Sequence, residues 1–168
     1  KALTHFQRVI EINPHYPKAY YYAGKSALLL GQPKQAAEFA EMEKRVNPEI
    51  ADPYILLSDI HFAQAQYSQA ASDLRKAVQI RPDDSGLYIQ LAKCYRLSGQ
   101  LDVASSMLRV AMAKESGNPD LYREQGAVFE KQGLPDQAVT AYQRYLQLKP
   151  NAEDRAEVRG RIQQLGGS

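Results

Sequence analysis

Residues 119–152 read PDLYREQGAVFEKQGLPDQAVTAYQRYLQLKPNA, and this stretch decides the fold. Tyr122 stands in its first apolar segment, Gly133 interrupts the pattern, Ala138 stands in the second segment, and Pro150 ends it. Apolar residues recur at helical spacing in both halves, and glycine suits the left-handed conformation that commonly ends a helix. The stretch therefore predicts two helices joined by a turn at Gly133.

The same pattern recurs along the chain at a constant interval. Prolines at positions 14, 48, 82 and 150 are separated by 34, 34 and 68 residues, which is one, one and two periods. A tyrosine follows six residues after each proline position, and Ser116 replaces the expected fourth proline: Tyr20, Tyr54, Tyr88 and Tyr122. An alanine recurs without exception: Ala36, Ala70, Ala104 and Ala138. Self-similarity at a fixed period predicts a stack of helical hairpins, because one such unit cannot bury its apolar face alone.

Further columns hold the same phase. Small residues stand in the middle of each first segment, in the pairs Ala23-Gly24, Leu57-Ser58, Leu91-Ala92 and Gln125-Gly126. A turn glycine follows at Gly31, Gly99 and Gly133, with Ala65 as the exception. These columns resemble the tetratricopeptide repeat (TPR) family over nearly the whole chain. The resemblance implies an all-α fold, an α-solenoid wound as a right-handed superhelix, that binds proteins and does not catalyse a reaction.

The phase of the columns also divides the chain. Complete repeats are expected at residues 17–50, 51–84, 85–118 and 119–152. Residues 1–16 match only the second helix of a truncated repeat, so the natural N-terminus is expected to lie upstream. Residues 153–165 are expected to form a C-terminal capping helix, and 166–168 a frayed end or linker.

Local signals predict individual helix ends. Asn118 followed by Pro119 offers an N-cap and a proline suited to the first helical turn. Asn151, followed by Glu153 and Asp154, predicts the same role for a last helix that runs to about Leu165. The glycines at 31, 99 and 133 predict helix ends.

The second helix of the first complete repeat, Lys34 to Val46, departs from the columns. Ala40 and Glu43 stand where larger apolar and small residues are expected. One interpretation is drift, with Phe39 and Met42 taking over the contact. The other is an acidic outer patch for a second partner, formed by Glu38, Glu41 and Glu43.

Composition excludes several functions. With 21 basic and 19 acidic residues the net charge is +2, which lacks the basic footprint of a nucleic-acid-binding protein. The apolar runs are too short to span a bilayer, so no direct membrane insertion is expected. Cys94 is expected to be a small buried filler and His61 a histidine at a helix contact. His5, His15 and His61 show no metal-ligand spacing, so no metal site, cofactor or catalytic residue is predicted. The compartment stays open between cytoplasm and periplasm.

Candidate binding residues follow from the resemblance. In TPR proteins the first helix of each pair lines a concave groove, and residues three and four apart share one helical stripe. The predicted groove residues for a protein or peptide ligand are Lys18, Tyr21, Tyr22, Lys25, Leu28, Ile55, Asp59, Phe62, Ile89, Lys93, Arg96 and Arg123. The clamp that holds the carboxylate of chaperone peptides in some members is not matched, since its asparagine positions carry Lys25 and Asp59. A mixed apolar and charged segment fits better.

An alternative function remains open. The chain could act through its ends as a structural spacer or assembly subunit, because residues 1–16 leave Leu3, Phe6 and Ile10 without a first-helix partner. An end-to-end homodimer through residues 1–16 follows from that interpretation. The resemblance implies a context such as a larger bacterial assembly or motility protein, or a eukaryotic co-factor, since repeat arrays of this kind occur in both. The glutamine-rich, lysine-poor composition favours the bacterial alternative.

Overall fold

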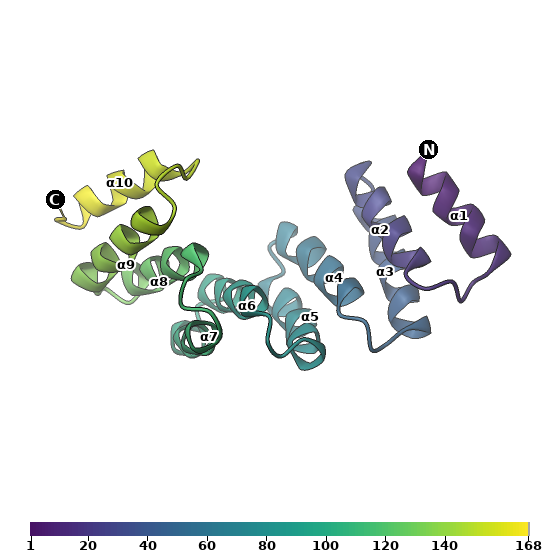
Figure 1. The fold of residues 1–168 in the computed structure, drawn as a ribbon, viewed down its shortest axis with the longest axis horizontal. Coiled ribbons are helices and arrows are strands. Elements are labelled where there is room, and N and C mark those ends of the chain that lie inside the picture. The colour runs from purple at the N-terminus through teal and green to yellow at the C-terminus, as the bar shows by residue number, and fades with distance from the viewer. Residues whose placement is uncertain (168) are drawn as a thin grey trace. The chain divides into compact units, whose positions relative to one another are not determined.

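The computed structural model describes residues 1–167, and these residues form ten α-helices without a β-strand (Figure 1). The helices are α1 (Ala2–Ile12), α2 (Ala19–Leu29), α3 (Pro33–Val46), α4 (Asp52–Ala63), α5 (Tyr67–Ile80), α6 (Ser85–Leu97), α7 (Leu101–Lys114), α8 (Pro119–Lys131), α9 (Pro135–Leu148) and α10 (Arg155–Gln164). The predicted all-α class is confirmed. Ser168, the last residue of the predicted frayed end, lies outside the described residues.

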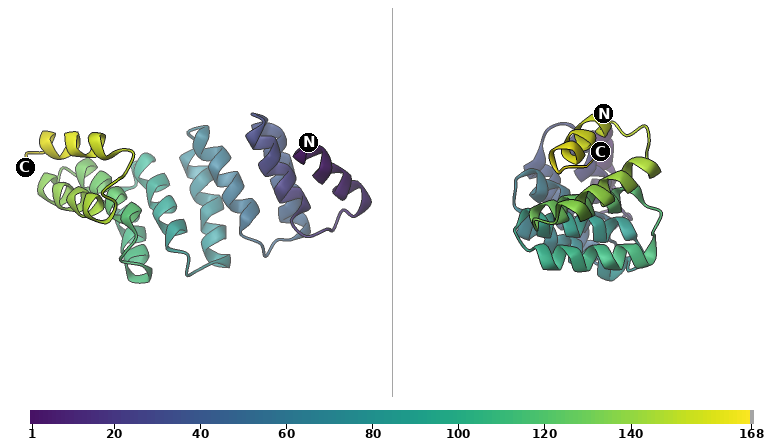
Figure 2. Two further views of the ribbon diagram at one scale, coloured as in Figure 1. Left: turned by 45° about the horizontal axis from the view of Figure 1, so that its top comes forward. Right: turned by 90° about the vertical axis from the view of Figure 1, so that its left-hand side faces the viewer.

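The chain forms two compact units, Lys1–Pro82 with α1–α5 and a second that begins at Asp83 with α6–α10. In the first unit α2 packs on α3 and α4 on α5, while α1 packs on α2 and α3 on α4. In the second unit α6 packs on α7 and α8 on α9, while α7 contacts α8 and α9 contacts α10. Helices that follow one another in the chain therefore pair, as Figure 2 shows for each unit by its colours.

The turn within each pair has a residue in the left-handed region. Gly31, Gly99 and Gly133 have φ values of 73°, 83° and 72°, which confirms the predicted helix ends. Ala65 stands in the same position of the α4–α5 pair and also has a positive φ, 57°. An L-residue with a Cβ atom is disfavoured there by about 1–2 kcal/mol, so this turn is strained where the other three are not.

Small residues let the paired helices approach closely. Ala36, Ala70, Ala104 and Ala138 are all fully buried, with 0% of each exposed. On the facing helix of the last pair, a Cβ atom built on Gly126 would lie 2.5 Å from the Tyr142 ring. The alanine and glycine columns therefore mark the contact between the two helices of a pair.

Of the two predicted N-cap residues, Asn118 and Asn151, the structure confirms the first and contradicts the second. Asn118 caps α8, since its Oδ1 accepts a hydrogen bond from the Asp120 amide at 3.0 Å, as predicted. The predicted N-cap at Asn151 is wrong, because α10 begins at Arg155 with Asp154 as its N-cap residue. Asp154 makes no side-chain cap bond to its own helix. Its carboxylate instead binds residues of α8 and α9.

Helix α3, where Ala40 and Glu43 depart from the repeat columns, matches neither interpretation fully. Phe39 packs against the core of the first unit, but Met42 is exposed and does not take over the contact. The predicted acidic outer patch is wrong in one member, because Glu43 is fully buried. Glu38 and Glu41 are exposed. A buried carboxylate requires partners, and Glu43 finds two of them at the start of α2.

Candidate functional site

The candidate site is the stripe of predicted groove residues on the first helix of each pair. We call its part in the first unit the N-terminal stripe, formed by Lys18, Tyr21, Tyr22, Lys25 and Leu28 around α2 and by Ile55, Asp59 and Phe62 on α4. The second unit carries Ile89, Lys93 and Arg96 on α6 and Arg123 on α8. Spacings of three and four residues place each set on one side of its helix.

Aromatic side chains dominate the α2 half of the N-terminal stripe. Tyr22 remains 44% exposed although its ring stacks on Phe6 of α1, with ring centroids 5.4 Å apart. Tyr21 lies beside Tyr22, at 5.2 Å between centroids, and packs partly against the core together with Leu28. Lys25 is exposed. This half thus presents apolar ring surface that the helix backbone holds in place.

The start of α2 is fixed by the buried carboxylate of Glu43. Its Oε1 accepts a hydrogen bond from the Lys18 amide at 3.2 Å, and its Oε2 accepts one from the Tyr21 amide at 3.1 Å. Asn47 Nδ2 donates a third, at 2.6 Å. The N-cap residue Lys18 supplies no side-chain cap and has a φ of 61°. A carboxylate from α3 therefore satisfies amides that the first turn of α2 would leave unpaired, and it also favours the positive end of the helix dipole.

An ion cluster links the starts of α2 and α4. Lys18 Nζ donates to Asp52 Oδ2 at 2.8 Å, and Arg81 pairs with the other oxygen of Asp52. Desolvation alone would raise the pKa of Asp52, but the hydrogen bonds from Lys18 and Arg81 hold it below its usual value. The charge of Lys18 is therefore engaged within the chain.

The α4 half of the N-terminal stripe combines apolar surface with one acid. Ile55 and Phe62 are half-buried, and the Phe62 ring contacts Tyr67 of α5 edge-on at 5.3 Å between centroids. Asp59 lies between them along the helix and is exposed to solvent. The surrounding protein still raises the pKa of its carboxyl, because it replaces part of the hydration of the charged form.

The corresponding side of the second unit is hollow. A cavity of about 650 Å³ is lined by α6, α8, α9 and the segment that leads to α10, and it includes the predicted residues Ile89, Lys93 and Arg123. Ile89 is only 8% exposed and belongs to the core cluster around Leu108 and Leu121, so it contributes mainly to packing.

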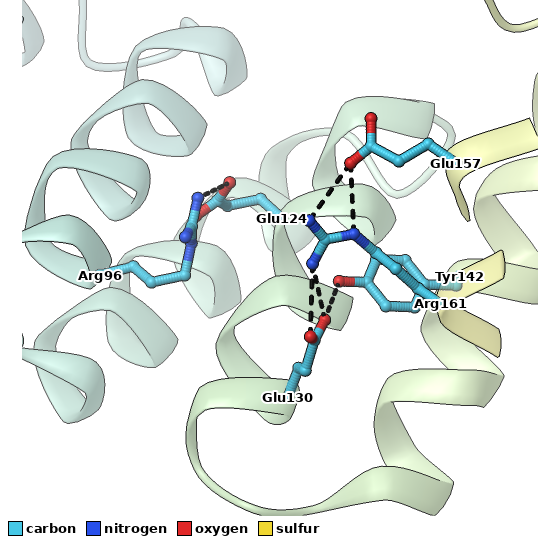
Figure 3. A network of polar contacts seen from close by, with 6 residues as sticks. All are labelled: Arg96, Glu124, Glu130, Tyr142, Glu157 and Arg161. Atoms are coloured by element: carbon cyan, nitrogen blue, oxygen red, sulfur yellow. Dashed lines mark hydrogen bonds and ion pairs between the residues drawn. The ribbon is translucent and has the colours of Figure 1, made fainter. Parts of the chain in front are cut away.

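The arginines of this side are paired with acids of the chain. Arg96 binds the buried Glu124 through two hydrogen bonds, Nε to Oε1 at 2.5 Å and Nη2 to Oε2 at 3.2 Å. Figure 3 shows this pair beside a second cluster, in which Arg161 of α10 lies between Glu157 and Glu130. Arg161 Nη1 is 3.1 Å from Glu130 Oε2, the oxygen that also accepts the Tyr142 hydroxyl at 2.8 Å. These contacts hold α6 to α8 and α8 to α10.

Arg123 is bound in the same way. Its guanidinium donates to Asp154, whose other oxygen accepts the Tyr145 hydroxyl at 2.6 Å. Desolvation would raise the pKa of Asp154, but these two hydrogen bonds lower it below the usual value. Burial and the same hydrogen bond raise the pKa of Tyr145 to about 12. Asp154 therefore joins α8 and α9 to the start of α10 in place of capping that helix.

Two further residues that the sequence singled out, His61 and Cys94, are both removed from full solvent exposure. His61 is half-buried at the contact between α4 and α5, where its Nδ1 lies 2.7 Å from Oδ2 of Asp73. Cys94 is buried. Across residues 1–167, the structure contains no group of three or more histidines, cysteines and acids that could hold a metal ion. In the same residues no helix is long and apolar enough to cross a membrane.

A second cavity lies on another side of the last complete pair. It has a volume of about 640 Å³ and is lined by α8 and α9, with Tyr122 and Phe129 from the side of α8 that carries the repeated tyrosine. Arg144 of α9 lies over the Tyr122 ring, 5.8 Å from its centroid. This cavity is lined by none of the predicted groove residues.

The sequence did not predict the internal contacts of three acids that organise the stripe: Glu43, Glu124 and Asp154. Glu43 was visible as a charged residue in a column of buried residues. Arg96 and Glu124 are 28 positions apart, and Arg123 and Asp154 are 31 apart, both close to one repeat. Opposite charges at such separations on a repeat array could have indicated contacts between successive first helices.

Comparisons with known proteins identify the repeat. Two family models, both described as tetratricopeptide repeat, match residues 61–124 and 120–152, which together make up more than half of the chain. No curated protein matches the sequence significantly.

Solved structures of repeat proteins are similar over most of the chain. A thermophilic TPR protein from Thermus thermophilus, TTC0263, is 26% identical with a TM-score of 0.74, and the match covers 97% of this chain and 88% of that one. YrrB, described as a TPR protein with an unusual peptide-binding site, is 20% identical with a TM-score of 0.79, covering 94% and 81%. MamA from Desulfovibrio magneticus RS-1 is 15% identical with a TM-score of 0.73, covering 89% and 93%. The chain belongs to the tetratricopeptide repeat family.

Proposed function

We propose that this chain binds a segment of a partner protein on the N-terminal stripe of α2 and α4. Tetratricopeptide repeat proteins are protein–protein interaction scaffolds, and the family is typically non-catalytic. The observation that carries the proposal is the exposed and half-buried aromatic and aliphatic surface of Tyr22, Ile55 and Phe62, which adjoins the exposed charges Lys25 and Asp59. Large rings with adjacent polar groups are typical of residues that dominate binding energy at protein interfaces.

The second unit offers less free binding capacity on the corresponding side. Arg96 and Arg123 already bind Glu124 and Asp154, and Ile89 is buried. A ligand that used either arginine would first have to break an internal ion pair. The first unit is therefore the better candidate for the main contact. The similarity to YrrB, whose description names a peptide-binding site, supports a peptide segment as the ligand class. The glutamine-rich, lysine-poor composition favours a bacterial source. Because repeat arrays of this kind are common in bacterial assembly and motility proteins, we include that context in the proposal.

A random peptide library displayed on phage tests this proposal. Peptides selected on the wild-type chain should lose binding to the triple variant Tyr22→Ala/Ile55→Ala/Phe62→Ala, called the stripe variant below. The matched control is Met42→Ala/Val103→Ala, which removes two apolar side chains that are exposed on second helices. Circular dichroism must show equal helicity for both variants. Selected peptides that bind the stripe variant as tightly as the wild type would refute the assignment.

A second candidate function is self-association through residues 1–16. It is supported by α1, which has no buried residue and ends at Ile12, 74% exposed. Ala2 and Phe6 stand in columns that are buried in the complete pairs, yet here they are exposed and half-buried. Light scattering at tens of micromolar tests this candidate, with Phe6→Ala as the comparison. A monomeric wild-type chain at that concentration contradicts it.

A further inference from the structure

Asp59 differs from the acids that hold the stripe together in having no partner. Asp52, Glu124 and Asp154 each bind a cationic side chain of the same unit. Within residues 1–167 the structure shows no hydrogen bond or ion pair to the Asp59 side chain. The protein around it nevertheless removes part of its hydration, which raises its pKa. A partly desolvated carboxylate without a partner gains more from an incoming cation than a fully hydrated one does.

The neighbours of Asp59 on α4 are apolar. Ile55 lies four residues before it and Phe62 three residues after it, so all three lie along one stripe. Both apolar side chains are half-buried and leave surface for contact. A cation that reaches Asp59 must therefore lie between two apolar surfaces, which favours an amphipathic side chain with a long aliphatic stem.

Lys25 limits the charge of the partner. It is exposed on α2, the other helix of the N-terminal stripe, and has no ion pair in the described part of the chain. A uniformly basic segment would bring like charge close to Lys25, and like-charge contacts across an interface are unfavourable. The stripe thus favours a single basic residue among apolar ones over a polybasic tail.

We propose that the partner segment presents one lysine or arginine, flanked by apolar residues, to Asp59. This inference rests on the proposed binding function of the N-terminal stripe and names the chemistry of its ligand. The cationic group binds the Asp59 carboxylate, while the flanking residues contact Ile55 and Phe62. Asp59 acts as the residue that selects the ligand.

The peptide library provides the first test. Peptides selected on the wild-type chain should be enriched in a lysine or arginine next to apolar residues, compared with the unselected library. Selection on Asp59→Lys should instead enrich aspartate or glutamate at that position. The same amino-acid preferences from both selections would overturn the proposal.

Affinities of one selected peptide provide the second test. Asp59→Asn should weaken its binding about tenfold, which corresponds to about 1.4 kcal/mol and lies between the values for exposed and buried ion pairs. The matched control Glu38→Gln neutralises an exposed acid of α3 and should leave the Kd unchanged. Replacing the basic residue of the peptide by alanine should cost about tenfold on the wild-type chain and almost nothing on Asp59→Asn. Additive losses in this cycle would show that the two groups do not interact.

Loss of folding is separable from loss of binding. Asp59→Asn removes an unpaired and partly desolvated charge, so the variant should be at least as stable as the wild type. Failure of the inference is also distinct from failure of the proposed function. If the stripe variant loses binding but Asp59→Asn does not, the choice of a basic ligand is wrong and the stripe remains the site. If the stripe variant keeps binding, the proposed function itself fails.

Discussion

Replacing Gly126 by alanine should destabilise the chain, whereas the same replacement at Gly160 should stabilise it. The two glycines are one repeat period apart and lie inside helices of the second unit, α8 and α10. In both helices alanine is the better helix former, by about 1 kcal/mol. The difference between the two sites therefore comes from what surrounds the added methyl group.

At Gly126 the methyl group has no room. Its Cβ would lie 2.5 Å, 2.6 Å and 2.8 Å from three atoms of the Tyr142 ring. The ring cannot easily move away, because Tyr142 is buried and its hydroxyl donates to Glu130 at 2.8 Å. Overpacking of this kind costs about 1–3 kcal/mol, and several contacts this short place the cost near the upper value. After the gain in helix propensity, the net loss should be about 2 kcal/mol.

At Gly160 the methyl group meets nothing within 4 Å. The gain in helix propensity then remains, so Gly160→Ala should add roughly 0.5–1 kcal/mol. Urea unfolding followed by far-ultraviolet circular dichroism measures both effects, and the two midpoints should move in opposite directions. A Gly126→Ala variant that is as stable as Gly160→Ala would refute the close contact between α8 and α9 as the reason for the glycine.

Three further changes test other features. Ala65→Gly should stabilise the first unit by about 1 kcal/mol, since φ is 57° there, whereas Ala63→Gly, in the last turn of α4, should destabilise it in the same urea assay. Glu43→Ala should cost about 2–3 kcal/mol, because it leaves the Lys18 and Tyr21 amides without their charged acceptor; wild-type stability of this variant would contradict the capping of α2 by Glu43. The fold lowers the pKa of Asp154 below its ordinary value of 3.8. Its contribution to the free energy of unfolding is therefore fully present at pH values above 3.8, and it is lost as the pH falls through the pKa of the folded state. Asp154→Asn should therefore be less stable than the wild type at about pH 7, and this difference in thermal unfolding should shrink as the pH falls below 3.8. A difference that stays constant as the pH falls would exclude the ion pair between Asp154 and Arg123 as its source.

The repeat period explains why the fold could be predicted from sequence. The contacts within one hairpin recur in the next hairpins with the same residue types. One packing requirement, a small residue where paired helices touch, is therefore visible four times, at Ala36, Ala70, Ala104 and Ala138. The turn glycines report another, and even Ala65 takes the left-handed conformation that its position demands. Each requirement is local to one unit, and repetition makes it visible above the background of single residues.

The polar contacts of the stripe could not be predicted in the same way, because they differ from repeat to repeat. Glu43 replaces a small residue of its column and looked like drift or surface charge. Its carboxylate binds backbone amides 25 and 22 positions earlier, and backbone amides carry no sequence signal. Asp154 follows a good N-cap signal at Asn151, and its ion pair with Arg123 holds it in a different role. Side-chain contacts that occur in only one repeat leave no recurring pattern in the sequence.

Under the proposed function, the internal pairing of charges decides which stripe residues a ligand could use. To use Arg96, a ligand must separate it from Glu124, and breaking a buried pair leaves an uncompensated charge that costs about 3–5 kcal/mol. Such a ligand would have to recover this amount before it gained any affinity. Lys25 and Asp59 require no such exchange, since neither has an ion pair in the described residues. By helical position alone, Arg96, Lys25 and Asp59 are equivalent candidates for binding a ligand. The free-energy cost of breaking the internal ion pair of Arg96 favours the N-terminal stripe as the proposed site.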